Sequence, residues 1–159
     1  MDKVGLGGGC HWCTEAIFKS LKGVLKVEQG FISSVGTDSA YSEGVIIHYS
    51  PRTISLKTLI EIHLNTHSST TDHQLRTKYR SGVYTFSSTQ FEIAQRLLVD
   101  FQSVFNGQLI TKIYSFVNFR PSKEQFIDYY HSNPDKPFCK RYIYPKLRLL
   151  QKDFNRYAV

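Results

Sequence analysis

The chain has 159 residues, 41% of them hydrophobic, and a formal net charge of +7. This length fits a single domain spanning residues 1–159 with a core of its own, and the composition excludes a disordered chain. No apolar stretch approaches the roughly 18 residues of a membrane span, and no secretory signal opens the sequence. We therefore expect a cytoplasmic protein that has no membrane partner.

The positive charge permits contact with nucleic acid but does not require it. The densest basic run, from Lys140 to Lys152, falls on an amphipathic final helix, so we interpret it as a solvated face and expect no nucleic-acid partner. Three cysteines are an odd number, which argues against a disulfide scaffold and for reduced thiols with a chemical task.

Hydrophobic periodicity and turn residues predict alternating strands and helices in chain order. The expected strands are 3–6, 24–32, 43–49, 80–86 and 109–119, and the expected helices are 16–22, 55–67, 87–105, a short one near 123–131 and a final one from about 140. The second and third strands should pair as neighbours. This order predicts an α+β fold, a two-layer plait in which helices cover one mixed or antiparallel sheet, with a C-terminal extension.

Between the first strand and the first helix lies the sequence Gly7-Gly8-Gly9-Cys10-His11-Trp12-Cys13. Cys10 should sit at a helix N-terminus, where free N–H groups and the helix dipole lower the pKa of a thiol. A free cysteine is more often a small buried hydrophobe, but the glycine turn and the nearby Cys13 favour a reactive sulfur. The C-x-x-C spacing brings two sulfurs within bonding distance in redox enzymes.

Glu43 lies at the start of an otherwise apolar strand. An outward-facing carboxylate is the ordinary interpretation. A half-buried carboxyl can instead stay protonated near neutral pH and deliver a proton.

Four segments together resemble the A-type methionine sulfoxide reductases. Gly9–Cys13 is similar to the family's G-C-F-W-G or G-C-F-W-C turn, Glu43–Pro51 to its H-A-E-x-V-x-V-x-Y-D-P strand, Lys78–Ser81 to its Q-Y-R-S, and Asn133–Cys139 to its N-P-x-G-Y-C with one residue inserted. The resemblance covers nearly the whole chain. It implies a ferredoxin-like core and an enzyme, expected here as a monomer, that reduces the S epimer of methionine sulfoxide, free or in proteins, without metal or organic cofactor.

The same resemblance implies roles for individual residues. Cys10 attacks the sulfoxide sulfur and is left as a sulfenic acid, which a second thiol must resolve before thioredoxin reduces the disulfide. Cys13 and Cys139 both qualify as that second thiol, and the spacing leaves the choice open; Cys139 could equally be a surface cysteine in a mobile tail. Glu43 is the general acid, and the Tyr79 phenol donates a hydrogen bond to the sulfoxide oxygen.

The substrate-binding positions depart from the family. Trp12 should supply an apolar wall for the substrate methyl group, but His11 replaces the phenylalanine beside it and makes one wall polar. Tyr41 takes the place of the motif's histidine and is the candidate for the family's second tyrosine. Gln74 stands where an aspartate is usual, and Glu124-Gln125-Phe126 lacks the histidine of E-x-x-H-Q. We expect a divergent subgroup with a rebuilt supporting shell.

Two other functions remain open. A thioredoxin-like disulfide oxidoreductase also uses a strand, C-x-x-C and a helix, although no proline separates these cysteines. A basic nucleic-acid-binding or zinc module could use Cys10, Cys13 and a histidine. His63 and His67 have an i, i+4 metal-ligand spacing, but no third ligand is evident, so we expect helix packing from them and no metal site.

Overall fold

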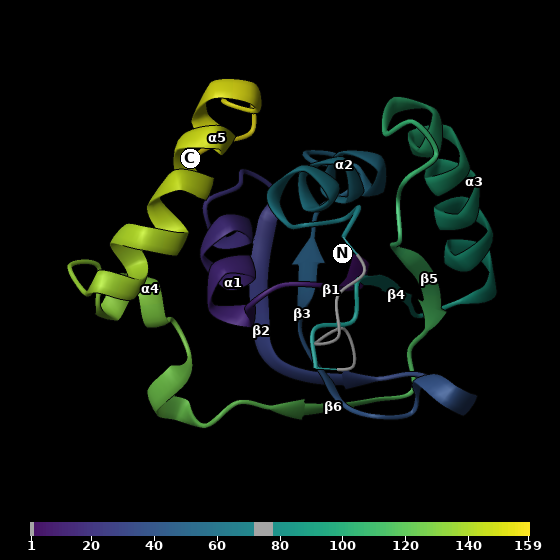
Figure 1. Ribbon diagram of the computed structural model, residues 1–159, viewed down its shortest axis with the longest axis horizontal. Helices are drawn as coiled ribbons and strands as arrows, with labels where there is room; N and C mark the ends of the chain where they lie inside the picture. Colours follow the sequence, from purple (N-terminus) through teal and green to yellow (C-terminus); the bar gives the residue numbers. More distant parts are fainter. Residues whose placement is uncertain (1, 72–77) are drawn as a thin grey trace.

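The computed structural model describes residues 2–71 and 78–159, without the side chains of residues 125 and 131. Figure 1 shows helices gathered over a curled sheet. In chain order the elements are β1 (Asp2–Gly7), α1 (His11–Lys19), β2 (Val24–Ser33), the 3-10 turn η1 (Gly36–Asp38), β3 (Ser42–Tyr49), α2 (Leu56–Thr66), β4 (Gly82–Thr85), α3 (Ser88–Val104), β5 (Lys112–Ser115), β6 (Asn118–Pro121), the 3-10 turn η3 (Glu124–Phe126), α4 (Tyr129–Ser132), the π-helical turn η4 (Cys139–Ile143) and α5 (Tyr144–Asp153).

The sheet has the strand order β5-β4-β1-β3-β2-β6. Its four central strands are antiparallel, and together with α1 and α2 they form the β-α-β-β-α-β unit of a ferredoxin-like plait. β5 runs parallel to β4 at one edge, and β6 runs antiparallel to β2 at the other. The predicted α+β fold, with helices on a mixed sheet, is confirmed, and so is the predicted pairing of β2 with β3.

The two faces of the sheet bury different side chains, because successive residues of a strand point to opposite sides. Val4, Leu6, Val45 and Ile47 belong to one large buried cluster that also takes apolar residues from α1, α2, α3 and α5. The other face buries a small cluster around Ile32, Ile46 and Tyr84 within the curl of the sheet. Because both faces are buried, the register of the central strands is fixed. The segments that leave the ends of these strands are positioned as a result.

Both long helices have a serine at the N-cap. Ser55 Oγ accepts a hydrogen bond from Thr58 N ahead of α2, and Ser87 Oγ accepts one from Gln90 N ahead of α3. The first helix, predicted over residues 16–22, begins and ends earlier in the chain. α1 ends at Lys19 because the chain tightens there, with Ser20 N donating to Ile17 O.

The prediction of one strand over residues 109–119 is wrong. This segment forms β5 and β6, which lie at opposite edges of the sheet. Phe116 N donates to Thr85 O at 2.9 Å, and Val117 N donates to Ser33 O at 3.1 Å, so adjacent residues bond to strands from the two halves of the sheet. The curl brings the ends of β4 and β2 close enough for two residues to bridge them, and β6 then runs across one end of the sheet (Figure 1).

The short helix predicted near residues 123–131 is also interrupted. Asp128 adopts a left-handed backbone conformation, with φ of 58°, between η3 and α4. Its N–H donates to Glu15 Oε1 on α1 at 2.8 Å, which ties this turn to the helix that follows Cys10. Within residues 2–71 and 78–159, no helix is both long enough and apolar enough to cross a membrane.

Candidate active site

Cys10 lies between β1 and α1, as predicted. Gly8 makes the turn with φ of 139°, and a Cβ there would lie 2.7 Å from a ring carbon of His67. Cys10 occupies the N-cap position of α1, and its carbonyl accepts hydrogen bonds from the N–H groups of Cys13 and Thr14 at 3.1 and 3.2 Å. The thiol therefore stands at the positive end of a nine-residue helix.

The two thiols of the C-x-x-C pair have opposite pKa shifts. A hydrogen bond from the Cys13 side chain is the main cause that lowers the pKa of Cys10, and the N–H groups of Trp12 and Cys13 add to it; burial and the Glu43 charge oppose them. The same hydrogen bond, together with burial and the Cys10 charge, raises the pKa of Cys13 far above its usual value. Cys10 is thus the more readily ionised thiol of the pair, and Cys13 is the one that keeps its proton.

Cys139 lies beside this pair. It is fully buried and shares a cluster with Cys13, Ala16 and Ile143, against which Cys10 packs. Burial raises the pKa of Cys139, while the Lys136 charge lowers it. All three cysteines are unpaired. The alternative of a surface cysteine in a mobile tail is wrong, because the π-helical turn η4 packs this thiol against α1.

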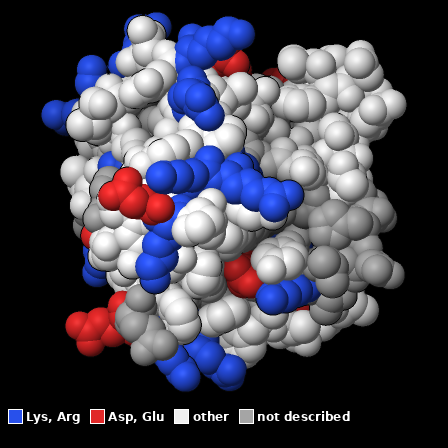
Figure 2. Space-filling model, turned by 60° about the vertical axis from the view of Figure 1, so that its left-hand side comes forward, with Lys and Arg blue, Asp and Glu red and all other residues white. Residues whose placement is uncertain are grey.

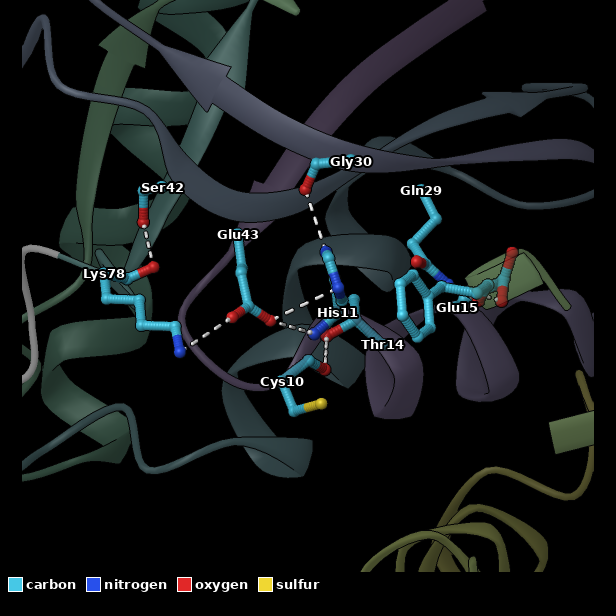
Figure 3. Close-up of polar contacts among 10 residues, drawn as sticks. Cys10, His11, Thr14, Glu15, Gln29, Gly30, Ser42, Glu43 and Lys78 are labelled. Atoms are coloured by element: carbon cyan, nitrogen blue, oxygen red, sulfur yellow. Dashed lines mark hydrogen bonds and ion pairs between the residues drawn. The ribbon is translucent and has the colours of Figure 1, made fainter. Parts of the chain in front are cut away.

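Glu43 and His11 meet next to Cys10, as Figure 3 shows. Glu43 is the second residue of β3 and is 7% exposed. Its Oε1 accepts a hydrogen bond from His11 N at 3.2 Å and lies 3.5 Å from His11 Nε2. The Lys78 ammonium lies 3.8 Å from the other oxygen, Oε2. His11 Nδ1 lies 2.9 Å from the carbonyl oxygen of Gly30 on β2.

The segment that carries Tyr79 is fixed directly to β3. Glu43 N and Ser42 Oγ both donate to Lys78 O at 2.9 Å, and Arg80 N donates to Ser42 Oγ at 2.7 Å. These hydrogen bonds fix the main chain at Tyr79 relative to Glu43. The predicted proton donor and the predicted phenol are brought together through main-chain hydrogen bonds.

Cys10 and Tyr79 open onto one hollow of about 230 Å³, here called the thiol hollow. Its lining comprises Gly8, Gly9, Cys10, His67, Ser68, Tyr79 and Lys146. A larger hollow of about 480 Å³ lies at the other end of β1 against Lys3 and Gln90, and none of the three cysteines lines it. The chemistry therefore belongs to the smaller hollow.

Trp12 takes part in an aromatic group from the C-terminal segment. Its ring stacks on Tyr129 at 4.1 Å and on Phe126 at 5.7 Å, and it meets the edge of Phe138 at 5.2 Å. Trp12, predicted as an apolar wall, thus belongs to a group of four packed rings. Segments more than 110 residues away from Trp12 in the sequence hold it in place.

Tyr41, a further substrate-binding candidate, does not line the thiol hollow. Tyr41 lies against β6, where its hydroxyl accepts a hydrogen bond from Asn118 Nδ2 at 2.9 Å and its ring faces the Arg120 guanidinium at 4.4 Å. Gln74 lies outside the described residues. The thiol hollow is therefore completed by other side chains.

Lys146 is the functional candidate that the sequence did not indicate, since it falls in the basic run interpreted as a solvated face. From α5 it donates to the carbonyl oxygen of Thr66, at the end of α2, at 2.7 Å and lines the thiol hollow. Its charge lowers the pKa of Cys13, against the larger effects that raise it. Lys and Arg predominate over Asp and Glu on the face that carries α4 and α5 (Figure 2).

The glutamate that ties the C-terminal segment to α1 was likewise not singled out. Glu15 is 1% exposed, and its Oε1 accepts from Gln29 Nε2 and from Asp128 N. Burial is the main cause that raises the pKa of Glu15, and the Lys19 charge opposes it. By fixing Asp128, Glu15 positions the turn that presents Tyr129 to Trp12.

The histidines at the metal-ligand spacing make other contacts. His63 Nε2 lies 2.8 Å from Gly7 O, His67 Nε2 lies 2.8 Å from Ser81 Oγ, and the two rings stack at 4.1 Å. Burial lowers the pKa of His63 well below its usual value, so its ring is neutral. No group of three or more His, Cys, Asp and Glu suited to a metal ion occurs in the described part of the chain.

A thiolate backed by a second thiol, beside a buried carboxyl and a phenol, defines a thiol-dependent oxidoreductase. A family model described as peptide methionine sulfoxide reductase matches residues 2–157. The peptide methionine sulfoxide reductase MsrA of Chromobacterium violaceum is 32% identical over 98% of this chain and 97% of its own. The chain belongs to the peptide methionine sulfoxide reductase family.

Solved structures share the fold. Mxr1 from Saccharomyces cerevisiae in reduced form superposes with a TM-score of 0.76 at 23% identity, over 87% of this chain and 88% of its own. Mxr1 in complex with Trx2 superposes with a TM-score of 0.65 at 21% identity, over 80% and 84%.

Proposed function

We propose that this protein is an enzyme that reduces the S epimer of methionine sulfoxide, free or in proteins, within a single catalytic domain of residues 1–159. The observation that carries the proposal is the arrangement around the thiol hollow. Cys10, with its lowered pKa, opens onto it together with Tyr79, and Glu43 is held beside both. Membership of the peptide methionine sulfoxide reductase family supports the choice of substrate.

In the proposed reaction, the Cys10 thiolate donates an electron pair to the sulfoxide sulfur. The sulfur–oxygen bond of the substrate breaks, the oxygen ends on Cys10 as a sulfenic acid, and methionine leaves two electrons more reduced. One proton must reach that oxygen, and Glu43 supplies it. The Tyr79 phenol donates a hydrogen bond to the same oxygen, and Trp12 provides the apolar surface for the methyl group.

A second thiol then restores the enzyme. Cys13 is our first resolving residue, because its side chain already donates a hydrogen bond to Cys10, so the two sulfurs start close together. Attack of the Cys13 sulfur on the sulfenic acid forms the disulfide and releases water. Cys139, buried against Cys13, is placed to receive the disulfide next and pass it to a reductant.

Thioredoxin is the proposed reductant. The shared fold with Mxr1, whose structure is known in complex with Trx2, supports this partner. Three unpaired cysteines are consistent with a reducing compartment, and we place the enzyme in the cytoplasm. Because one chain supplies every residue of the site, we expect a monomer.

The test is methionine production from methionine-S-sulfoxide with dithiothreitol, with the R epimer as the control substrate. Cys10→Ser should form no methionine, because a hydroxyl near pH 7 is not an adequate nucleophile for sulfur. Turnover by that variant, or equal use of both epimers, would end the proposal. Reduction of insulin disulfides without sulfoxide reduction would favour a thioredoxin-like oxidoreductase, and co-purified zinc would favour a metal module.

A further inference from the structure

His11 is a departure from the family pattern that lies directly beside Cys10, because it stands where the hallmark turn has phenylalanine. His11 is 7% exposed. Its ring packs edge-on against the ring of Phe31, with 5.3 Å between the two ring centroids. The ring therefore keeps the packing position of an aromatic wall. It also brings two nitrogens that can carry protons.

The contacts of the ring decide which nitrogen is a donor. The carbonyl oxygen of Gly30 can only accept, so Nδ1, 2.9 Å away, carries a proton and donates it. In a neutral imidazole the other nitrogen, Nε2, then has a lone pair. Nε2 faces Glu43 Oε1 at 3.5 Å, and an ionised carboxylate is also an acceptor. In a buried site two facing acceptors are unfavourable unless a proton lies between them.

We propose that His11 and Glu43 hold one proton jointly, and that His11 keeps this proton on the pair until Glu43 delivers it to the sulfoxide oxygen. The proton can be drawn as a carboxylic acid donating to Nε2 or as an imidazolium donating to the carboxylate; the pair carries one proton in either form. His11 is a positioning residue here, because it acts through Glu43. The proposal rests on the proposed function.

The surrounding charges are compatible with a shared proton. The Lys78 ammonium lies 3.8 Å from Glu43 Oε2 and favours the carboxylate, while the Cys10 thiolate favours a positive imidazole. Both therefore stabilise the ion-pair form of the dyad without removing its proton. The other titratable groups of the site are Tyr79, held beside Glu43, Cys13 in the first turn of α1, and His67 and Lys146 in the lining of the thiol hollow. β2 contributes the uncharged Gly30 and Phe31.

The proton balance of the reductive step follows directly. Cys10 supplies the electron pair, the substrate sulfur is reduced, and its oxygen leaves with the proton from the His11–Glu43 pair to complete the sulfenic acid. The pair is left one proton short, with Nε2 and Oε1 again facing each other as acceptors. Proton uptake from water resets it before the next turnover.

The first experiment restores the family's residue with His11→Phe and follows single-turnover methionine formation from pH 6 to pH 9. We expect the rates of parent and variant to be most alike near pH 6, the most acidic condition, where protons from water are most available to the site. The decline at high pH should begin about one unit lower in the variant, which makes it about tenfold slower than the parent near pH 8.5. A merely structural role would lower the rate equally at every pH.

The chain offers a matched control on strands β2 and β3. His48 Nε2 on β3 lies 2.7 Å from Glu28 Oε2 on β2, and neither residue lines the thiol hollow. His48→Phe removes a histidine–glutamate pair of the same kind and should leave the pH–rate profile unchanged. An equal shift in both variants would overturn the proposal, because it would reflect a general charge effect.

A second measurement needs neither activity nor a variant that folds. Nitrogen-15 NMR of the labelled histidines reports whether Nε2 of His11 is protonated, hydrogen-bonded or bare. We expect a protonated or hydrogen-bonded Nε2 at pH 7 in the parent. A bare Nε2 there, or superimposable pH–rate profiles for His11→Phe and the parent, would overturn the shared proton. Failure of the proposed function would instead appear as absent methionine in the parent, whatever the NMR result.

Discussion

Glu43→Gln separates proton delivery from nucleophile strength at this site. The amide is isosteric with the carboxyl, and its oxygen can still accept the hydrogen bond that His11 N makes to Oε1 at 3.2 Å. The fold should therefore survive. What is lost is the proton, and general-acid catalysis contributes about 10²–10⁴ in rate, or about 2.7–5.4 kcal/mol of barrier.

The same substitution should leave Cys10 at least as available as a thiolate. The hydrogen bond from Cys13 is the main cause that lowers the pKa of Cys10, and the Glu43 charge acts against it. Without that charge the pKa of Cys10 should not rise, so iodoacetamide should alkylate it at least as fast in the variant below pH 7. Glu43→Gln should therefore slow sulfoxide reduction while alkylation of Cys10 stays at least as fast as in the parent.

The assay is rapid-quench single turnover with enzyme in excess over methionine-S-sulfoxide, paired with alkylation rates on the same samples. A methionine-forming rate within about threefold of the parent would refute Glu43 as the donor, and His11 or Tyr79 would then have to supply the proton. Alkylation slowed in parallel with reduction would also refute the reasoning, because the loss would then lie in the nucleophile.

Three further predictions concern recycling, pH-dependent stability and the edge of the sheet. Cys13→Ser should still form one equivalent of methionine but no resolving disulfide, as read by intact mass, whereas Cys139→Ser should mainly weaken turnover with thioredoxin. Burial raises the pKa of Glu15 above 4.5, so the unfolded chain loses this proton first and the free energy of unfolding should fall as pH rises above 4.5; Glu15→Gln should flatten that dependence in urea titrations. In Gly30→Ala the new Cβ would lie 2.3 Å from the carbonyl oxygen of Arg120, so β6 must shift, at a cost of about 1–3 kcal/mol in unfolding free energy.

Each of these has a contrary outcome. A dominant Cys10–Cys139 linkage with Cys13 free throughout would return Cys13 to a packing role. The unfolding free energy of the parent could instead rise with pH just above 4.5, and rise more than that of Glu15→Gln. That result would contradict a Glu15 pKa raised by burial. An unchanged denaturation midpoint in Gly30→Ala would mean that β6 accommodates the methyl group without cost.

The sequence by itself determined the local framework of the site. Glycines after an apolar strand, followed by helical spacing, placed Cys10 at a helix N-terminus, because turn formation and helix initiation depend on neighbouring residues. The order of strands and helices predicted a two-layer α+β plait, since short connections leave few ways to pair four such strands, and the family resemblance implied its ferredoxin-like core. The match to a family motif placed Glu43 and Tyr79 near Cys10, and hydrogen bonds between residues 42–43 and 78–80 now account for it.

Only the tertiary structure decided the rest of the site. The burial of Cys139, the reach of Lys146 to Thr66 and the bond from Asp128 to Glu15 each join residues 80 or more apart in sequence. Residues 109–119 also required the tertiary structure. Their apolar pattern predicts a strand, but it does not tell which edge of the sheet the strand joins. Periodicity reports which side of an element is buried, whereas the identity of the facing residue depends on how the sheet curls and how the helices pack on it. The His11–Glu43 contact is of this second kind, since the pairing of β2 with β3 is what brings Gly30 and Glu43 to the two nitrogens of one ring.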